Sequence, residues 1–140
     1  SRIVKRDLND GLGDFPVKFD CIIAAHIIHH LDYPELFFQQ ARRLLTGTGC
    51  IVVAIPNITY YKYRLGFLFG RFPPISLAHR NFQTPREFEL LARSSGFAVA
   101  RRLPEKRTLR ARLSPTLFSQ NIIYVLNPSA PLSGASSRPA

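Results

Sequence analysis

Three histidines, His26, His29 and His30, follow directly on an apolar run that ends at Ala25. Imidazole titrates near neutral pH, so His29 or His30 is a candidate general base that would take a proton from a substrate hydroxyl. The structural alternative is that His30 packs in the core. The i, i+3, i+4 spacing of the three would also suit a metal, but no carboxylate or cysteine is spaced to complete the coordination shell. We therefore predict no metal site.

A second group of chemically useful side chains lies in residues 58–70, a segment that is both aromatic and basic. Tyr60, Tyr61 and Arg64 would line a pocket for a substrate, or they would only cover the edge of a sheet. Three tyrosines among basic residues favour a wet, partly exposed surface. His79 raises the same question farther along the chain.

Regular elements must position these residues, and we expect the run from Asp20 to Ala25 to be the central one. The run is apolar without polar alternation, which is typical of a strand buried on both faces of a parallel sheet. Open α/β sheets bind their ligands at the carboxyl ends of such strands. Residues His26 to Leu31 are therefore predicted to form one wall of a site.

The residues that follow predict a strand–helix–strand unit. Asp32 as the cap and Pro34 in the first turn begin a helix that runs through Leu45. Residues 50–55 form a second buried strand, which stops at Pro56. Elements of these lengths in this order make a right-handed βαβ unit.

Further elements are predicted from hydrophobic patterns and end signals. They are a short strand at Ile3–Lys5, helices at Ile58–Gly70 and Arg86–Ser95, and strands at Phe97–Leu103 and Leu117–Leu126. Thr84 caps the second of these helices and Gly96 ends it. A basic loop joins the last two strands. Residues 1–127 are therefore predicted to form one α/β domain, which the family resemblance described below implies to be incomplete, and residues 128–140 a disordered tail rich in Pro, Ser and Ala.

The composition limits the functional classes. With 140 residues, 46% of them hydrophobic, the chain is the size of one domain with a core. Nineteen Lys and Arg against nine Asp and Glu give a net charge of +10, which favours anionic partners such as nucleic acid, acidic ligands or a membrane surface. The excess gathers in residues 101–112, a run that could equally be a solvated face.

The two cysteines, Cys21 and Cys50, have neither metal nor disulfide spacing. We expect both to be buried, reduced thiols and the protein to be cytoplasmic. No apolar run reaches the roughly 18 residues of a membrane helix, so no membrane contact is expected. The chain begins with Ser1 and contains no Met, which we interpret as a fragment of a longer protein.

Three blocks of residues, in a fixed order and spacing, carry a family resemblance. The first is Asp7-Leu8, Gly11-Leu12, Phe15-Pro16 and Phe19 to Ile23; the second is His29 to Leu31, Pro34, Ala41 to Leu45, Gly47, Gly49 and Pro56-Asn57; the third is Tyr63 to Leu65, Gly70-Arg71, His79, Phe82, Thr84, Phe88 to Leu91 and Gly96-Phe97. Together they resemble the second half of a class I S-adenosylmethionine-dependent methyltransferase. Within that class the chain looks most like the methionine-biosynthesis (MetW-like) or a related small-molecule branch.

The resemblance implies a Rossmann-like sheet of seven strands whose last strand is antiparallel. This chain would hold the third to seventh strands with flanking helices and would lack the first two. The resemblance also implies S-adenosyl-L-methionine as the cofactor, whose methionine and ribose are held by the missing part. The chain alone is therefore expected to be inactive until its N-terminal half, or a partner chain, completes the sheet.

The resemblance also assigns site residues by position. Asp7 matches the residue that receives the adenine amino group, and the backbone amide of Leu8 faces the ring, although Asp7 could instead cap nearby amides. The loop beneath the cofactor is matched by Ala25, His26 and Ile27. The substrate side is matched by Pro56, Asn57 and the aromatic helix that carries Tyr60, Tyr61 and Arg64. In the family a glutamate often accompanies the histidine, and His29 stands in its place.

The predicted function is methyl transfer to a small-molecule acceptor, in which the enzyme mainly holds the nucleophile and the methyl in near-attack geometry. A non-catalytic, methyltransferase-like partner subunit is an alternative. A less favoured one is a nucleic-acid-binding module that uses Arg101 to Arg112 with stacking tyrosines, because that run has no regular spacing and lies between two strands.

The missing strands would also leave an unpaired edge beside Asp20–Ala25. An exposed apolar edge favours aggregation. We therefore expect marginal stability unless the strand at Ile3 shifts across or another chain fills the gap.

Overall fold

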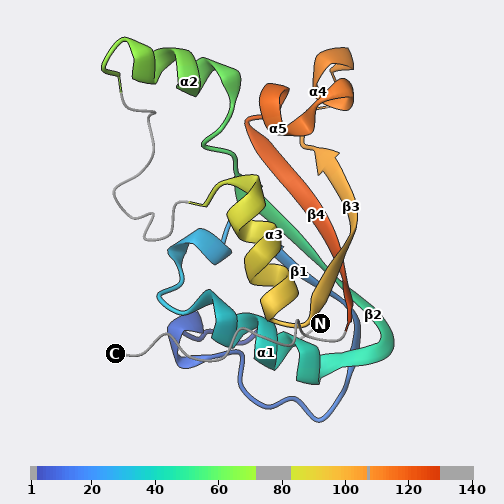
Figure 1. Ribbon diagram of the computed structural model, residues 1–140. Helices are drawn as coiled ribbons and strands as arrows, with labels where there is room; N and C mark the ends of the chain where they lie inside the picture. Colours follow the sequence, from blue (N-terminus) through green and yellow to red (C-terminus); the bar gives the residue numbers. More distant parts are fainter. Residues whose placement is uncertain (1–2, 72–82, 107, 130–140) are drawn as a thin grey trace.

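The chain folds around a four-stranded sheet in the computed structural model, which describes residues 3–71, 83–106 and 108–129. The strands are β1 (Phe19–Ala25), β2 (Leu45–Pro56), β3 (Phe97–Pro104) and β4 (Asn121–Pro128), in the spatial order β1-β2-β4-β3. β1 is parallel to β2, and β4 lies antiparallel between β2 and β3. The predicted α/β class and the antiparallel last strand are therefore confirmed (Figure 1).

Helices and 3₁₀ turns join the described strands. They are η1 (Leu8–Asp10), η2 (Ile28–His30), α1 (Pro34–Leu44), α2 (Tyr61–Leu68), α3 (Pro85–Ser94), α4 (Leu109–Leu113) and α5 (Pro115–Phe118). Figure 1 shows α1 and α3 over one face of the sheet, whereas α2, α4 and α5 gather at the end where β2 finishes. Within the described ranges, no helix has both the length and the apolar character needed to cross a membrane.

The core lies between the sheet and helices α1 and α3. Val53 of β2 and Tyr124 of β4 are register partners that face it, and both are fully buried. The ring of Phe38 in α1 lies 5.7 Å from that of Phe97 and 6.2 Å from that of Phe88 in α3. Burying one such side chain contributes roughly 1.5–3 kcal/mol. This aromatic contact fixes both helices on the same face.

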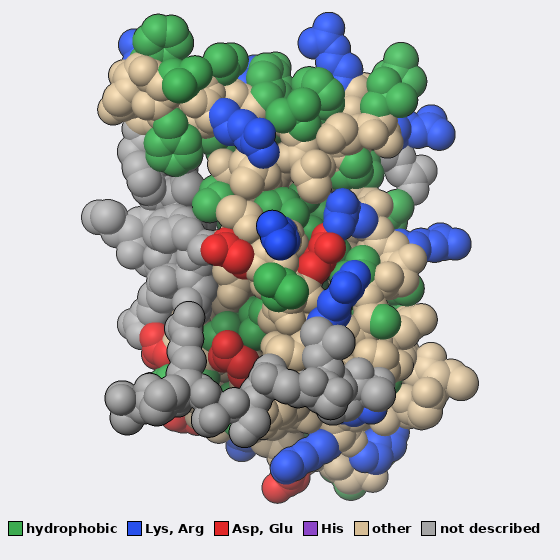
Figure 2. Space-filling view, viewed as in Figure 1, with side chains coloured by type: hydrophobic (Ala, Val, Ile, Leu, Met, Phe, Trp, Pro, Cys, Tyr) green, Lys and Arg blue, Asp and Glu red, His purple; other side chains and the backbone are tan. Residues whose placement is uncertain are grey.

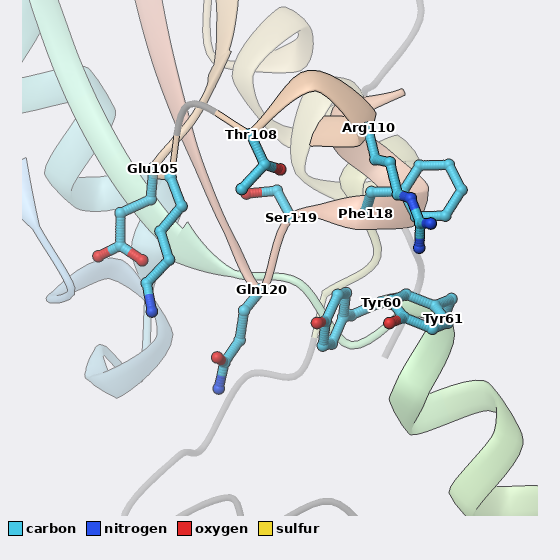
Figure 3. Close-up of a pocket in the computed structure, with 9 residues that line it drawn as sticks. Tyr60, Tyr61, Glu105, Thr108, Arg110, Phe118, Ser119 and Gln120 are labelled. Carbon is cyan, nitrogen blue, oxygen red and sulfur yellow. The ribbon is translucent and has the colours of Figure 1, made fainter. Parts of the chain in front are cut away.

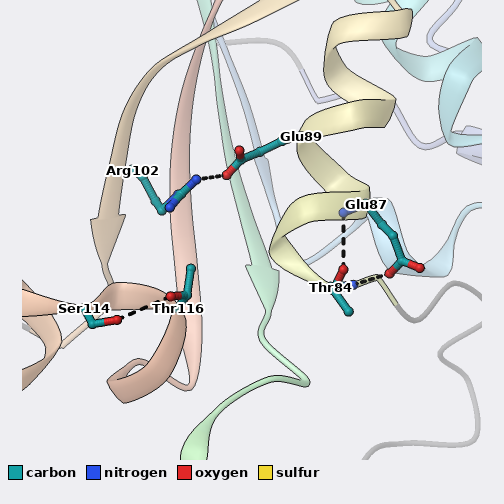
Figure 4. A network of polar contacts seen from close by, with 6 residues as sticks. All are labelled: Thr84, Glu87, Glu89, Arg102, Ser114 and Thr116. Carbon is teal, nitrogen blue, oxygen red and sulfur yellow. Dashed lines mark hydrogen bonds and ion pairs between the residues drawn. The ribbon is translucent and has the colours of Figure 1, made fainter.

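Helix α3 begins with the capping signal that the sequence predicts. The backbone N–H of Glu87 donates to the Thr84 hydroxyl at 3.2 Å, and the N–H of Thr84 donates to the Glu87 carboxylate at 2.7 Å (Figure 4). Gly96 follows the helix with a φ of +81°, which favours glycine. Helix α1 differs, because Tyr33 is its N-cap and makes no side-chain capping bond. The prediction of Asp32 as cap is therefore wrong, although Pro34 is the first helical residue.

Strand β1 is less buried than its apolar sequence predicts. Ala24 is buried, but Ile23 is 72% exposed. β1 is an edge strand that pairs only with β2 among the described strands, and α1 and α3 cover only one of its faces. The prediction of a central strand buried on both faces is therefore wrong for this chain, because an apolar run does not show which neighbours are present.

Other boundaries also differ from the predictions. Ile3–Lys5 is not a strand, and Ile3 is 97% exposed. β2 begins at Leu45 rather than Cys50, because Leu45 is already in register with Phe19. The connection between β3 and β4 contains α4 and α5 instead of a plain loop, and β4 consequently begins at Asn121.

The sheet face opposite α1 and α3, which we call the open face, carries apolar side chains and both cysteines. Its residues alternate with those that face the core. They are Cys21, Ile23, Cys50, Val52, Ala54, Ile123 and Val125. Cys21 and Cys50 are register partners and free thiols, the first exposed and the second half-buried. The prediction of two buried cysteines is therefore wrong.

Candidate functional site

The carboxyl end of β1 turns sharply at His26. Ala25 pairs with Ala54, and the N–H of His26 donates to the carbonyl of Ala54 at 3.0 Å. His26 then has a φ of +53°, a left-handed conformation that is uncommon for residues other than glycine and tends to occur at functional sites. The chain therefore leaves the sheet abruptly at the position expected for a ligand.

The predicted histidines come together around η2. The ring centroids of His29 and His30 are 4.2 Å apart, and those of His26 and His29 are 6.2 Å apart. His29 is only 6% exposed, His30 is half-buried and His26 is exposed. In the parts of the chain described above, no three metal-ligating side chains are arranged to hold a metal ion. His30 is thus the more accessible of the two predicted proton acceptors.

Asp7 and Leu8 are tied to the same end of the molecule. The Asp7 carboxylate accepts the N–H of Asn9 at 2.9 Å and so caps η1. Asn9 in turn accepts the N–H of Asp32 at 2.9 Å, which connects η1 to the residues after η2. Leu8 packs against the core. The local capping role anticipated for Asp7 is therefore present, and its role at the adenine stays a prediction.

Asn57 ties the end of β2 to the turn before β4. Its side chain is fully buried, and its Nδ2 donates to the carbonyls of Thr116 at 2.8 Å and Ser119 at 2.7 Å. Its Oδ1 accepts the N–H of Thr59 at 3.0 Å and the Thr59 hydroxyl at 2.6 Å. All the polar capacity of this amide is thus used internally. Asn57 therefore positions the segments around it, and its assignment as a direct substrate contact stays a prediction.

A cavity lies beside this connection, between α2 and the α4–α5 segment (Figure 3). We call it the α2–α5 cavity; its volume is about 260 Å³. It is lined by Tyr60, Tyr61, Glu105, Lys106, Thr108, Arg110, Phe118, Ser119 and Gln120. The predicted substrate residues Tyr60 and Tyr61 therefore do line a cavity.

The other predicted substrate residues take different places. Pro56 is half-buried at the end of β2, and it pairs with Asn121. Arg64 is exposed, and its Nε donates to the carbonyl of Thr59 at 2.7 Å rather than facing the cavity. His79 lies outside the described residues.

Sequence reasoning missed the far wall of the α2–α5 cavity. Glu105, Lys106, Arg110 and Phe118 lie in a segment that we predicted as a solvated basic loop or part of a strand. Pro115, which is the first residue of α5, was the available signal that the strand begins later. No pattern in the sequence indicates that this segment meets Tyr60 and Tyr61.

The fold agrees with the comparison with known protein families. The family model described as a methyltransferase domain matches residues 3–101. The chain belongs to the class I S-adenosylmethionine-dependent methyltransferase family. The assignment to the MetW-like branch stays a prediction.

Individual curated relatives share only about a quarter of their residues with this chain over the matched segment. The mitochondrial ubiquinone biosynthesis O-methyltransferase of Mus musculus is 26% identical over 97 residues, which are 66% of this chain and 26% of that protein. This chain thus matches about a quarter of the length of that relative.

Solved structures share the fold at low sequence identity. A methyltransferase from Clostridium acetobutylicum has a TM-score of 0.63 and 12% identity, covering 92% of this chain and 65% of its own. The O-methyltransferase NcsB1, solved with S-adenosyl-L-homocysteine and 1,4-dihydroxy-2-naphthoic acid, has a TM-score of 0.54 and 13% identity, covering 83% of this chain and 31% of its own.

Proposed function

We propose that this chain provides the acceptor side and part of the cofactor side of a methyltransferase that acts on a small molecule. The observation that carries the proposal is the arrangement at one end of the sheet. The His26 turn at the end of β1 and the α2–α5 cavity beyond the end of β2 lie at the carboxyl ends of neighbouring parallel strands. Because β1 and β2 are neighbouring parallel strands, both features lie at the same end of the sheet, where open α/β sheets bind their ligands.

The residues present fit one side of S-adenosyl-L-methionine. The left-handed turn at His26 leaves the end of β1 open, and the Asn9–Asp32 hydrogen bond holds η1 beside it. Asp7, Leu8, Ala25, His26 and Ile27 would hold the cofactor there. When bound, the cofactor supplies an electrophilic methyl group on a sulfonium centre.

The chain's own part in the reaction is to position the acceptor and to receive its proton. Tyr60 and Tyr61 orient the acceptor in the cavity wall that Asn57 fixes. His30, half-buried and 4.2 Å from the ring of His29, accepts the hydroxyl proton. Fixed orientation contributes most of the rate enhancement, because the displacement must occur in line.

The proposal includes a further polypeptide segment that covers the open face. This face is apolar, and the outer edge of β1 has no partner strand within the described residues. The mouse relative is about four times longer than the segment it shares with this chain. The segment that we propose is the N-terminal half of the same protein, with a separate partner chain as the alternative. The two free thiols support a reducing, cytoplasmic location.

The test is calorimetric titration of S-adenosylhomocysteine into this chain and into the full-length protein. We expect binding by the full-length protein and none by this chain alone. If the full-length protein also fails to bind, the methyltransferase proposal is wrong and the non-catalytic partner subunit replaces it.

The nucleic-acid alternative is disfavoured by a contact in the basic run. Arg102 forms an ion pair with Glu89 (Figure 4), and its guanidinium lies 5.9 Å from the centre of the Tyr124 ring. Part of the basic run therefore packs on the protein itself. A steep fall of nucleic-acid affinity with salt would revive this alternative.

A further inference from the structure

The α2–α5 cavity has an aromatic wall of defined geometry. The ring of Tyr61 lies 4.9 Å from that of Tyr60, at 78°, and 5.6 Å from that of Phe118, at 60°. Figure 3 shows Tyr60, just before α2, and Tyr61, the first residue of α2, below Phe118 of α5. Aromatic rings prefer such edge-to-face and tilted partners. The wall therefore suits a planar aromatic ligand.

Asn57 holds the two halves of this wall together. Its Nδ2 binds the carbonyls of Thr116 and Ser119 on either side of Phe118, while its Oδ1 binds Thr59 just before Tyr60. The aromatic side chains thus come from segments fixed by a buried hydrogen-bond network. A preorganised wall loses little entropy when it binds a ligand.

Two cations line the same cavity without internal partners. Among the described residues, neither the guanidinium of Arg110 nor the ammonium of Lys106 makes a hydrogen bond or an ion pair. The acidic lining residue, Glu105, already accepts the Nδ2 of Asn121 at 2.8 Å. The lining is therefore cationic on balance, and a free guanidinium is suited to bidentate binding of a carboxylate.

The size of the cavity limits the ligand. A volume of about 260 Å³ is at the lower end of small-molecule sites, which are typically roughly 300–1,000 Å³. It suits one or two fused rings rather than an extended polyanion. Glu105 also opposes a strand of phosphates passing through the cavity.

We infer that the α2–α5 cavity binds an aromatic carboxylate, with the ring against Tyr61 and Phe118 and the carboxylate on Arg110 and Lys106. This inference rests on the proposed function, since it names the acceptor class of the same site. It adds Arg110, Lys106 and Phe118 as residues that determine acceptor specificity.

The experiment compares two matched ligands on the full-length protein. 4-Hydroxybenzoate and 4-hydroxybenzamide have nearly the same shape and differ in charge, and each is titrated calorimetrically. We expect the acid to bind about threefold to fivefold more tightly, because Arg110 and Lys106 are exposed and solvent weakens an exposed charge pair. Equal affinities, or no binding of either ligand, would overturn the inference.

Single substitutions test which side chains produce the preference for the acid. Arg110→Gln is expected to remove most of the preference for the acid, and Lys106→Gln to reduce it less. Arg112→Gln is the matched control, because Arg112 is exposed on the same short helix and does not line the cavity. A control that loses the preference as completely as Arg110→Gln would show a general effect of net charge and would also overturn the inference.

The two proposals fail in different ways. Binding of S-adenosylhomocysteine without preference for the acid would overturn the acceptor class and leave the methyltransferase function standing. Arg110-dependent binding of the acid without binding of S-adenosylhomocysteine would overturn the methyltransferase function and leave the ligand class standing.

Discussion

At the scale of single residues, Asn57 shows how a buried amide can shape a site without contacting its ligand. Two carbonyls and two donor groups of the surrounding chain depend on it. Removing such a side chain leaves buried polar groups without partners, and this costs more than the lost hydrogen bonds themselves. The shape of the α2–α5 cavity is therefore linked to the stability of the protein through this one residue.

We predict that Asn57→Ala lowers the free energy of unfolding by about 2–4 kcal/mol and weakens acceptor binding. Urea unfolding of the full-length protein measures the first effect and calorimetry the second. Asn127→Ala is the matched control, since Asn127 is exposed on β4 and should change neither quantity. An Asn57→Ala protein as stable as the wild type would contradict the positioning role.

A second prediction at this scale concerns His26, whose φ of +53° is unfavourable for residues other than glycine. His26→Gly is expected to leave the free energy of unfolding within about 1 kcal/mol of the wild type or to raise it. His26→Val is expected to lower it by about 1–2 kcal/mol, because a β-branched residue adopts this conformation poorly. Urea unfolding of both variants checks the prediction, and equal stabilities would show that the turn relaxes.

At the scale of elements, the strand–helix–strand unit and the capped helix α3 follow from patterns in the sequence, whereas the antiparallel last strand follows from the family resemblance. Hydrophobic periodicity and the Thr84 cap depend only on neighbouring residues, so both can be predicted from the sequence. The segment between β3 and β4 could not be predicted, because its basic residues are typical of a solvated loop and its short helices pack on each other and on β3, contacts that no sequence pattern indicates. The burial of β1 depends on strands that no local pattern reveals.

The capping box of α3 leads to a prediction of how the stability of the protein depends on pH. The hydrogen bonds from Thr84 lower the pKa of the Glu87 carboxyl below its ordinary value of 4.5. A carboxyl with a lowered pKa stabilises the fold above its unfolded-state pKa, and this contribution is lost as the pH falls through the folded-state value. Glu87→Gln should therefore destabilise the protein at pH 7 and make no difference near pH 2, as measured by urea unfolding at both pH values.

Thr84→Ala removes the other half of the same box. We predict a loss of about 1 kcal/mol in the free energy of unfolding at pH 7. Thr48→Ala, at an exposed position in β2, is the control. An equal loss in both variants would mean that the cap contributes nothing specific.

At the scale of the whole molecule, the sheet is covered on one face and bare on the other. Apolar residues of the open face and the unpaired edge of β1 together present a surface that favours self-association. The isolated chain is therefore expected to associate with increasing concentration and to unfold at a lower temperature than the longer protein that we propose.

We predict that Ile23→Lys reduces this self-association in sedimentation velocity, because Ile23 is 72% exposed at the centre of that edge. Leu113→Lys is the control, since Leu113 is 79% exposed but lies on α4, away from the edge. The same Ile23→Lys change should destabilise the full-length protein, in which we propose that the face is covered. A monomeric, high-melting isolated chain would contradict the prediction.

The thiol of Cys21 can report whether the open face is covered. The thiol stands on the open face beside Cys50, and partial desolvation together with that neighbour raises the pKa of Cys21. Alkylation by iodoacetamide should consequently be slow at neutral pH and faster as the pH rises, since the thiolate is the reactive form. In the longer protein that we propose, Cys21 would react only while the open face is uncovered, so the alkylation rate would measure how often that face opens.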